Sequence, residues 1–166
     1  MKVASRRIAL ERAKIIALAI MDKLLLYCEK LEVVGSIRRQ VSWVHDIDIV
    51  LIPKPEGMWN LHGEIARLSR PKTPKGGGKI VHFEVVDIPV DLYFADASTW
   101  ATLLLIRTGP TENNIRLCSI AKKKGWHLAA SGDGLFNERG ERIAGSTEES
   151  IFTALGLQYL PPEKRT

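Results

Sequence analysis

Two aspartates stand at the start of an otherwise apolar, β-branched segment, and this segment limits the possible folds more than any other part of the chain. Asp46 and Asp48 alternate with Ile47 and Ile49, and apolar residues continue to position 52. A period of two predicts a strand with both carboxylates on one face and the isoleucines on the other. Acidic residues are rare in strands and like charges on one face repel, so the pattern needs compensation by solvent or by a cation.

A divalent metal site is the interpretation that we favour for these aspartates. Carboxylate oxygens suit Mg²⁺, and two-metal sites hold their ions about 3.5–4 Å apart. A third carboxylate should come from a neighbouring strand, and Asp91 fits because strand-forming residues surround it. Asp87 is the rival, but Pro89 disfavours the continuous strand that Asp87 would need. An edge strand with a solvated acidic face is the alternative without a metal.

A turn with phosphate-binding groups precedes the acidic strand. The apolar run 31–34 predicts a buried strand that ends in a tight turn at Gly35 and Ser36, and Arg38 and Arg39 follow. Glycine exposes backbone N–H groups in such a turn, and arginine offers bidentate donors with a permanent charge. This equipment suits a triphosphate, and with the carboxylates it predicts in-line phosphoryl transfer. The alternative is a strand-end turn with two solvated arginines.

The remaining patterns predict an α+β chain: a mixed sheet with helices, followed by a small module of helices and hairpins. Proline and three glycines predict a mobile basic loop at 70–79, with no regular element. Hairpins are expected within 126–143, and Ser146 to Glu149 matches a capping box before a short helix. The periodicity predicts helices at 5–30 (with Ser5 as N-cap), 58–68, 99–106 and 111–124, and strands at 80–86 and 90–94.

Composition and charge agree with a soluble protein that meets nucleic acid. The chain has 166 residues and a net charge of +5, and a modest basic excess favours acidic partners. The apolar run 15–21 is too short to cross a bilayer, and the first residues lack a signal-peptide pattern. We expect a monomer without membrane contact that is cytoplasmic, and nucleoid-associated if the cell is prokaryotic.

The order of these motifs resembles the polymerase beta-like nucleotidyltransferase superfamily, and the second half of the chain narrows the resemblance to the family X DNA polymerases. Thr108, Gly109 and the proline after them resemble the family's Thr-Gly turn. Asn114 falls where the family places an asparagine that contacts the incoming base. Arg7 resembles an arginine that can reach the triphosphate, and the tail 155–165 resembles the family's closing segment.

This resemblance implies a minimal DNA-directed DNA polymerase, with a palm at residues 1–105 and a thumb-like nucleotide-binding subdomain at 106–166. It would use two Mg²⁺ ions, or Mn²⁺, to add a nucleotide from a (deoxy)nucleoside triphosphate to the primer 3′-OH of primer–template or gapped DNA in repair. The metal ligands would be Asp46, Asp48 and Asp91. The nucleotide contacts would come from Arg7, Gly35, Ser36, Arg39, Thr108, Gly109 and Asn114.

Four departures from the family pattern accompany the expectation of low fidelity and weak sugar discrimination. His45 stands where the family often has a glycine just before the first metal aspartate, which could alter a phosphate contact. Ile106 and Arg107 replace an aromatic pair that helps to exclude ribonucleotides. Cys118 lies where many members have an arginine that touches the template, although Arg116 is near enough to substitute. Pro89 replaces a basic residue that is common near the third aspartate, which weakens a primer-phosphate contact.

Electrostatics must supply much of the DNA affinity, because no segment resembles the family's lyase domain or helix-hairpin-helix clamp. We therefore expect a stripped core, comparable in size to the small viral members. The candidate phosphate contacts are Arg116 and two lysine groups, namely Lys72, Lys75 and Lys79 in the loop and Lys122, Lys123 and Lys124 at a helix end. Each lysine group has an equally good alternative, a solvated connection for the loop and a response to the helix dipole for the helix end.

Two other functions stay open at this stage. One is a nucleotidyltransferase that ignores a template or uses RNA ends or a small molecule as the acceptor. The other is a non-catalytic DNA-binding relic, against which the intact set of three aspartates argues. The Thr-Gly-Pro turn and Asn114 favour a module that reads a nucleotide.

Overall fold

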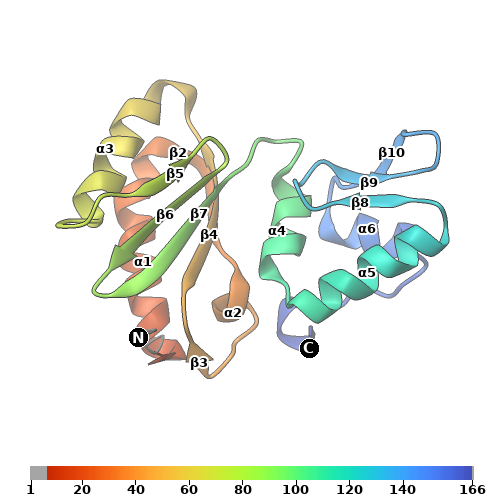
Figure 1. Ribbon diagram of the computed structural model, residues 1–166, viewed down its shortest axis with the longest axis horizontal. Coiled ribbons are helices and arrows are strands. Elements are labelled where there is room, and N and C mark those ends of the chain that lie inside the picture. Colours follow the sequence, from red (N-terminus) through yellow and green to blue (C-terminus); the bar gives the residue numbers. More distant parts are fainter. Residues whose placement is uncertain (1–6, 166) are drawn as a thin grey trace. The chain divides into compact units, whose positions relative to one another are not determined.

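The structure is a computed structural model that describes residues 7–165, and the chain divides into two compact units (Figure 1). The first unit ends at Phe94 and the second begins at Ala95. This division falls earlier than residue 105, because helix α4 (Trp100–Thr108) packs against α6 (Glu148–Ala154) and so belongs to the second unit.

A five-stranded mixed sheet forms the centre of the first unit, which confirms the expected α+β class. The order of the strands is β2-β4-β7-β6-β5, with β4 and β7 parallel and the other pairs antiparallel. The strands are β2 (Cys28–Val33), β4 (Ile47–Pro53), β5 (Lys75–Gly77), β6 (Ile80–Val85) and β7 (Ile88–Phe94).

Helices α1 (Leu10–Leu24) and α3 (Met58–Leu68) cover one face of this sheet (Figure 1). Alternate residues of the central strands, such as Ile49 and Leu92, are fully buried with these helices. Burying one such side chain contributes about 1.5–3 kcal/mol. The period of two then turns Asp48 and Asp91 to the other face, away from the helices.

The start of the first unit differs from the expected helix at 5–30. Within the described residues a short strand β1 (Ile8–Ala9) pairs with β3 (Trp43–Val44), and the helix spans only α1. A 3-10 turn, η1 (Leu25–Tyr27), then leads into β2, whose backbone pairs with β4. Sheet pairing therefore overrides the helical pattern at residue 28, while the expected N-cap Ser5 lies outside the described residues.

The prediction of a loop without regular structure at 70–79 is wrong in part. Residues of β5 add an edge strand to β6, even though two of the three are glycine. An edge strand needs only backbone donors and acceptors on one side, so a glycine run can supply it. Pro89 is likewise tolerated inside β7, because β4 pairs with β7 only from Val90 onward.

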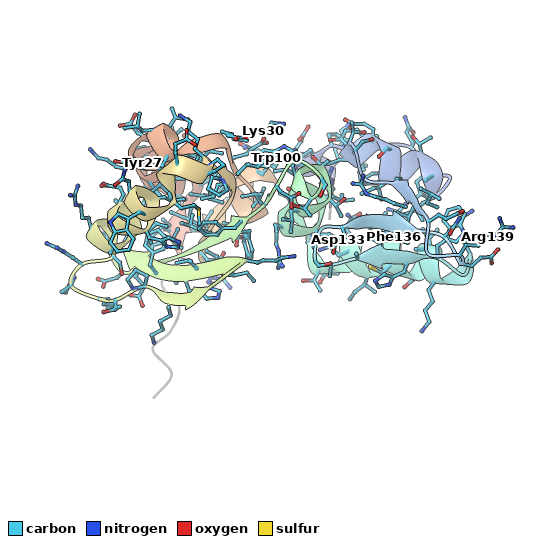
Figure 2. All side chains as sticks on the ribbon, turned by 90° about the horizontal axis from the view of Figure 1, so that it is seen from above. Tyr27, Lys30, Trp100, Asp133, Phe136 and Arg139 are labelled. Atoms are coloured by element: carbon cyan, nitrogen blue, oxygen red, sulfur yellow. The ribbon has the colours of Figure 1, made fainter. Side chains whose placement is uncertain are left out.

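The second unit contains the expected helices and hairpins. Helix α5 (Thr111–Lys123) follows α4, and β8 (His127–Ala129), β9 (Gly134–Phe136) and β10 (Arg142–Ala144) form an antiparallel sheet. The capping box of α6 uses Thr147 and Ser150, one residue later than expected. In Figure 2, Phe136 and Arg139 mark the end of β9 and the exposed turn before β10.

The remaining short elements are η2 (Pro55–Gly57), α2 (Gly35–Arg38) and η3 (Pro162–Lys164). The longest helix of the described part is α1, with 15 residues. Among residues 7–165, no helix combines the length and the apolar character that crossing a membrane requires.

Candidate active site

A single row of residues crosses the open face of the sheet and contains two of the three predicted carboxylates. Asp48 of β4 is the register partner of Asp91 of β7, and Asp91 is the register partner of His82 of β6. His82 is in turn opposite Lys75 of β5. Partners on adjacent strands lie on the same face, so the row Asp48–Asp91–His82–Lys75 is continuous across four strands.

Hydrogen bonds hold the two carboxylates of this row. The Tyr93 hydroxyl lies 3.2 Å from Oδ1 of Asp48 and 3.4 Å from Oδ2 of Asp91. Nδ1 of His82 lies 2.7 Å from Oδ1 of Asp91. The rival Asp87 lies in the turn between β6 and β7 with a φ of 62°, so the structure favours Asp91 as the third carboxylate.

Asp46 precedes β4 and is coupled to the row through its charge. Burial raises the pKa of the Asp46 carboxyl above its usual value, and the negative charge of Asp91 raises it further. The electrostatic interaction with His45, a backbone hydrogen bond and the charge of Arg39 act in the opposite direction and favour the carboxylate. A group that is half-buried beside another carboxylate is costly to ionise, which is typical of sites that bind a cation or a proton.

The three carboxylates do not converge into a preformed cage. Within the described residues, no group of three His, Cys, Asp or Glu side chains lies in position to hold a metal ion. In this structure the hydroxyl of Tyr93 and the ring of His82 occupy oxygens of Asp48 and Asp91. Of the three expected carboxylates, Asp48 and Asp91 are therefore register partners on adjacent strands, and Asp46 interacts with Asp91 through its charge.

Gly35 is required where it stands, beside Asp48. Its φ is +59°, and a Cβ at this position would overlap the carboxylate of Asp48. The backbone N–H of Val34 donates to the carbonyl of Asp48 at 2.8 Å, which fixes this approach. The residues expected as a tight turn instead form α2, a single helical turn that packs on β4.

The hydroxyl of Ser36 and the carboxylates near Gly35 are groups that fit a polar ligand. The Oγ of Ser36 is buried, and no residue in the described part of the chain hydrogen bonds to it. A buried hydroxyl without a partner is uncommon and indicates a place for a ligand atom or water. The carboxylates supply the oxygen donors that Mg²⁺ prefers. On these observations the residues present fit a divalent cation and a phosphate.

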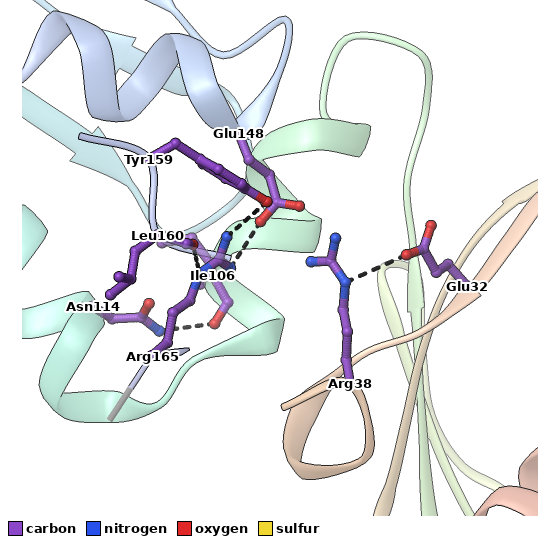
Figure 3. Close-up of polar contacts among 8 residues, drawn as sticks. All are labelled: Glu32, Arg38, Ile106, Asn114, Glu148, Tyr159, Leu160 and Arg165. Atoms are coloured by element: carbon purple, nitrogen blue, oxygen red, sulfur yellow. Dashed lines mark hydrogen bonds and ion pairs between the residues drawn. The ribbon is translucent and has the colours of Figure 1, made fainter. Parts of the chain in front are cut away.

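The arginines near this turn have different surroundings. Nε of Arg38 lies 3.3 Å from Oε1 of Glu32 on β2 (Figure 3), so this guanidinium is engaged within the first unit. Arg39 acts on the Asp46 carboxyl through its charge, as noted above. Arg7 is exposed and directly precedes Ile8. Ile8 pairs with Val44, so Arg7 lies beside the segment that leads from Val44 to Asp46.

The second unit brings the other predicted nucleotide-binding residues together. Thr108 is fully buried at the end of α4, and Gly109 follows it with a φ of 64°. Nδ2 of Asn114 donates to the carbonyl of Ile106 at 2.8 Å (Figure 3), which ties α5 to the end of α4. Its Oδ1 is buried, and no residue among 7–165 donates to it.

The candidate DNA-binding residues fall into both units. Lys72 pairs with Glu84, Lys75 belongs to the row described above, and Lys79 lies in the turn between β5 and β6. The second unit carries exposed Arg116 on α5, and Lys122, Lys123 and Lys124 at its end, where Nζ of Lys124 lies 5.1 Å from the centre of the Trp126 ring.

Tyr93 and His82 are site residues that the sequence patterns did not single out. Tyr93 had a weak signal, because it lies two residues after Asp91 in a strand and must share its face. His82 had none, because its position beside Asp91 follows only from the pairing of β6 with β7.

Comparison with known proteins gives consistent results. A family model described as "DNA polymerase beta thumb" matches residues 103–166. The repair DNA polymerase X of African swine fever virus (isolate Tick/Malawi/Lil 20-1/1983) is 30% identical over 139 residues, which covers 80% of this chain and 79% of the relative. The crystal structure of Leishmania infantum polymerase beta in a ternary P/T complex matches with a TM-score of 0.81 at 18% identity, over 97% of this chain and 77% of that one.

The mixed sheet followed by a thumb-like unit has the polymerase beta fold, and homology to DNA polymerases makes the chain a nucleotidyltransferase. Within that class, the identity and coverage of the viral relative show that the chain belongs to the family X DNA polymerases. Polymerases of this family generally work with divalent metal ions.

Proposed function

We propose that the protein fills short gaps during DNA repair, by adding a nucleotide to a primer 3′-OH on a template. The observation that carries this proposal is the register pair of Asp48 and Asp91, with Asp46 coupled to it and α2 packed beside it. The first unit would act as the palm and the second as the nucleotide-binding subdomain. The membership of family X and the names of the relatives support DNA and a nucleoside triphosphate as partners.

The residues of the first unit would have two roles, metal binding and phosphate binding. Asp46, Asp48 and Asp91 would hold two Mg²⁺ ions, with Mn²⁺ as a substitute. When bound, such ions neutralise the triphosphate and lower the pKa of the attacking hydroxyl. The N–H groups around Gly35 and the hydroxyl of Ser36 would bind phosphate oxygens, and Arg39 would stabilise charge on the leaving pyrophosphate.

We further propose low fidelity and weak sugar discrimination. The turn at Thr108 and Gly109 would place the nucleotide against α5, where the amide of Asn114 would face the base. Position 106 is a half-buried isoleucine, and its carbonyl is already bonded to Asn114. Aliphatic Ile106 offers less bulk against a ribose 2′-hydroxyl than an aromatic ring would.

Template-dependent incorporation tests this proposal. Four duplexes with a one-nucleotide gap, each with a different templating base, would be incubated with Mg²⁺ and each deoxynucleotide or ribonucleotide in turn. We expect the matched deoxynucleotide to be preferred, mismatches and ribonucleotides to be added at measurable rates, and chelation to stop all addition. Addition that ignores the template would indicate a terminal transferase, and addition only to RNA ends would indicate another acceptor.

A further inference from the structure

The outward face of helix α1 carries apolar side chains that the described part of the chain leaves largely uncovered. Ile15 and Leu18 are 68% and 63% exposed, whereas the inward face of the same helix is buried in the core, for example at Ala17 and Ile20. Residues three apart lie on the same side of a helix, so Ile15 and Leu18 adjoin each other. A helix that covers a sheet usually presents polar residues to solvent, so this face is unusual.

Neighbouring elements extend this apolar surface. Leu25 and Leu26 of η1 are exposed, and Trp59 of α3 is 89% exposed. Tyr27 of η1 packs close to Gly57, which precedes α3, and it lines a shallow pocket of about 180 Å³ together with Trp59, so the two elements adjoin. We call the following residues the outer patch: Ile15, Leu18, Leu25, Leu26 and Trp59.

The size of the outer patch suits a protein interface. Such an interface buries about 800 Å² on each partner. One tryptophan offers roughly 150–250 Å², and the four aliphatic side chains of the patch add to it. Exposed apolar patches of several hundred Å² mark interaction sites. The outer patch lies on the helical side of the sheet, whereas Asp48 and Asp91 turn to the other face, so it is not part of the proposed active site.

The charged residues at the two ends of α1 identify the partner. Glu11 and Arg12 lie in the first turn, and Asp22 and Lys23 lie in the last. All four are exposed, and neither Arg12 nor Asp22 forms an ion pair within residues 7–165. The helix runs from position 10 to position 24, so its midpoint is position 17. Positions 12 and 22 are equally far from this midpoint and carry opposite charges, and the same is true of positions 11 and 23.

This pattern of charges is complementary to itself. If two α1 helices lie antiparallel and meet at their midpoints, Arg12 of each copy is opposite Asp22 of the other. Glu11 is opposite Lys23 in the same way, in addition to its contact with Lys14 of its own helix. A two-fold axis repeats each contact, so the charges at both ends are compensated together. In a parallel pair, each charge would instead face its own like charge and repel it.

We propose that the protein forms a two-fold symmetric dimer through α1, with the outer patch in the interface. Ile15 of one copy would meet Ala19 of the other, an exposed residue whose small side chain lets the helices approach closely. Leu18 would lie beside the two-fold axis. A dimer departs from the monomer expected from the sequence, because helical periodicity alone does not show which apolar residues remain uncovered.

Charge reversal tests the pairing directly. Sedimentation equilibrium of the full chain would give the dissociation constant of the parent dimer, which we expect in the micromolar range. Arg12→Asp alone and Asp22→Arg alone each put like charges opposite each other, so each should weaken self-association by about tenfold or more. The double variant restores opposite charges and should associate like the parent. An equal mixture of the two single variants should also form a dimer, because one chain is then acidic and the other basic at both positions.

Two further variants locate the interface and control for net charge. Leu18→Glu should abolish self-association, because it places charges beside the two-fold axis. Arg139→Asp changes the net charge as much as Arg12→Asp does but lies in an exposed turn of the second unit, so it should leave the dissociation constant unchanged. Circular dichroism melts show that each variant is folded, and both reversals on α1 suit the helix dipole.

Three results would each overturn the proposal. The first is a parent that stays monomeric at its highest soluble concentration. The second is a parent dimer that survives Leu18→Glu in a folded protein. The third is a pair of folded single variants, Arg12→Asp and Asp22→Arg, that associate as the parent does or that fail to associate when mixed.

Discussion

The hydroxyl of Tyr93 lies 3.2 Å from Oδ1 of Asp48 and is shared with the neighbouring carboxylate of Asp91. Two carboxylates in register on one face repel each other, and a phenol donor reduces that cost when no cation is bound. A metal ion that binds these oxygens would draw on the same lone pairs and weaken the hydrogen bonds from the hydroxyl. Tyr93 thus competes with the cation for the same atoms.

Tyr93→Phe should expose this competition. Without metal, the variant should be less stable by about 1–2 kcal/mol, because a donor to a charged pair is lost. With Mg²⁺ its midpoint of thermal unfolding should rise more than that of the parent. Thermal melts with and without chelator measure both effects, and Tyr27→Phe on the helical side of the first unit is the control. An equal or smaller shift for Tyr93→Phe would contradict the competition.

Gly35→Ala should lower both stability and activity. The positive φ costs about 1 kcal/mol for alanine, and the added Cβ would push the carboxylate of Asp48 out of place. We expect the rate of nucleotide incorporation to fall at least tenfold. The melting temperature of the same variant measures the loss of stability. Gly63→Ala is a matched control on α3, where the new Cβ meets nothing within 4 Å. This substitution should raise the free energy of unfolding by about 0.5–1 kcal/mol, because alanine is the better helix former. A Gly35→Ala protein with parental activity would contradict the importance of the close approach between Gly35 and Asp48.

Asp46→Asn should make stability less dependent on pH. The pKa of Asp46 is raised in the folded state by burial and by Asp91. The folded protein therefore binds this proton more tightly than the unfolded chain does. The cost of ionisation appears as pH rises above about 3.8, the usual value, and is complete above the raised pKa.

In metal-free buffer the variant should melt at a higher temperature than the parent at pH 7, and the difference should vanish near pH 3. Thermal melts across this range, with a chelator present, provide the measurement. The same variant should lose incorporation activity, since it removes a proposed metal ligand. A lower melting temperature than that of the parent at pH 7 would show that ionised Asp46 stabilises the fold.

Arg165 fastens the end of the chain to the second unit. Its Nη1 lies 2.8 Å from Oε2 of Glu148, both side chains are buried, and Nε donates to the carbonyl of Leu160 at 2.8 Å (Figure 3). Arg165→Ala would leave Glu148 buried without this charge and should cost about 3–5 kcal/mol. Denaturant unfolding measures the loss, and exposed Arg139→Ala should stay within about 0.5 kcal/mol. A loss below about 1 kcal/mol for Arg165→Ala would mean that another group compensates the buried charge of Glu148.

Local patterns were enough to predict the elements that hold the site. The period of two around Asp48 and the apolar run around Asp91 both mark strands, and the expected helix at 58–68 has the bounds of α3. What local patterns could not provide is pairing between distant segments. The edge strand β5 and the position of His82 follow from such pairing, because neither a glycine run nor a single histidine has a local preference that predicts it.

The most direct test of the central claim compares Asp91→Asn with Asp87→Asn in Mg²⁺-dependent filling of a one-nucleotide gap. Both changes remove one carboxylate from the same hairpin, but only Asp91 lies in register with Asp48. We predict that Asp91→Asn lowers the rate by roughly a thousandfold or more, because it removes a proposed metal ligand, and that Asp87→Asn stays within about twofold of the parent. Parental activity in Asp91→Asn, or an equal loss in both variants, would contradict the assignment of this row as the active site.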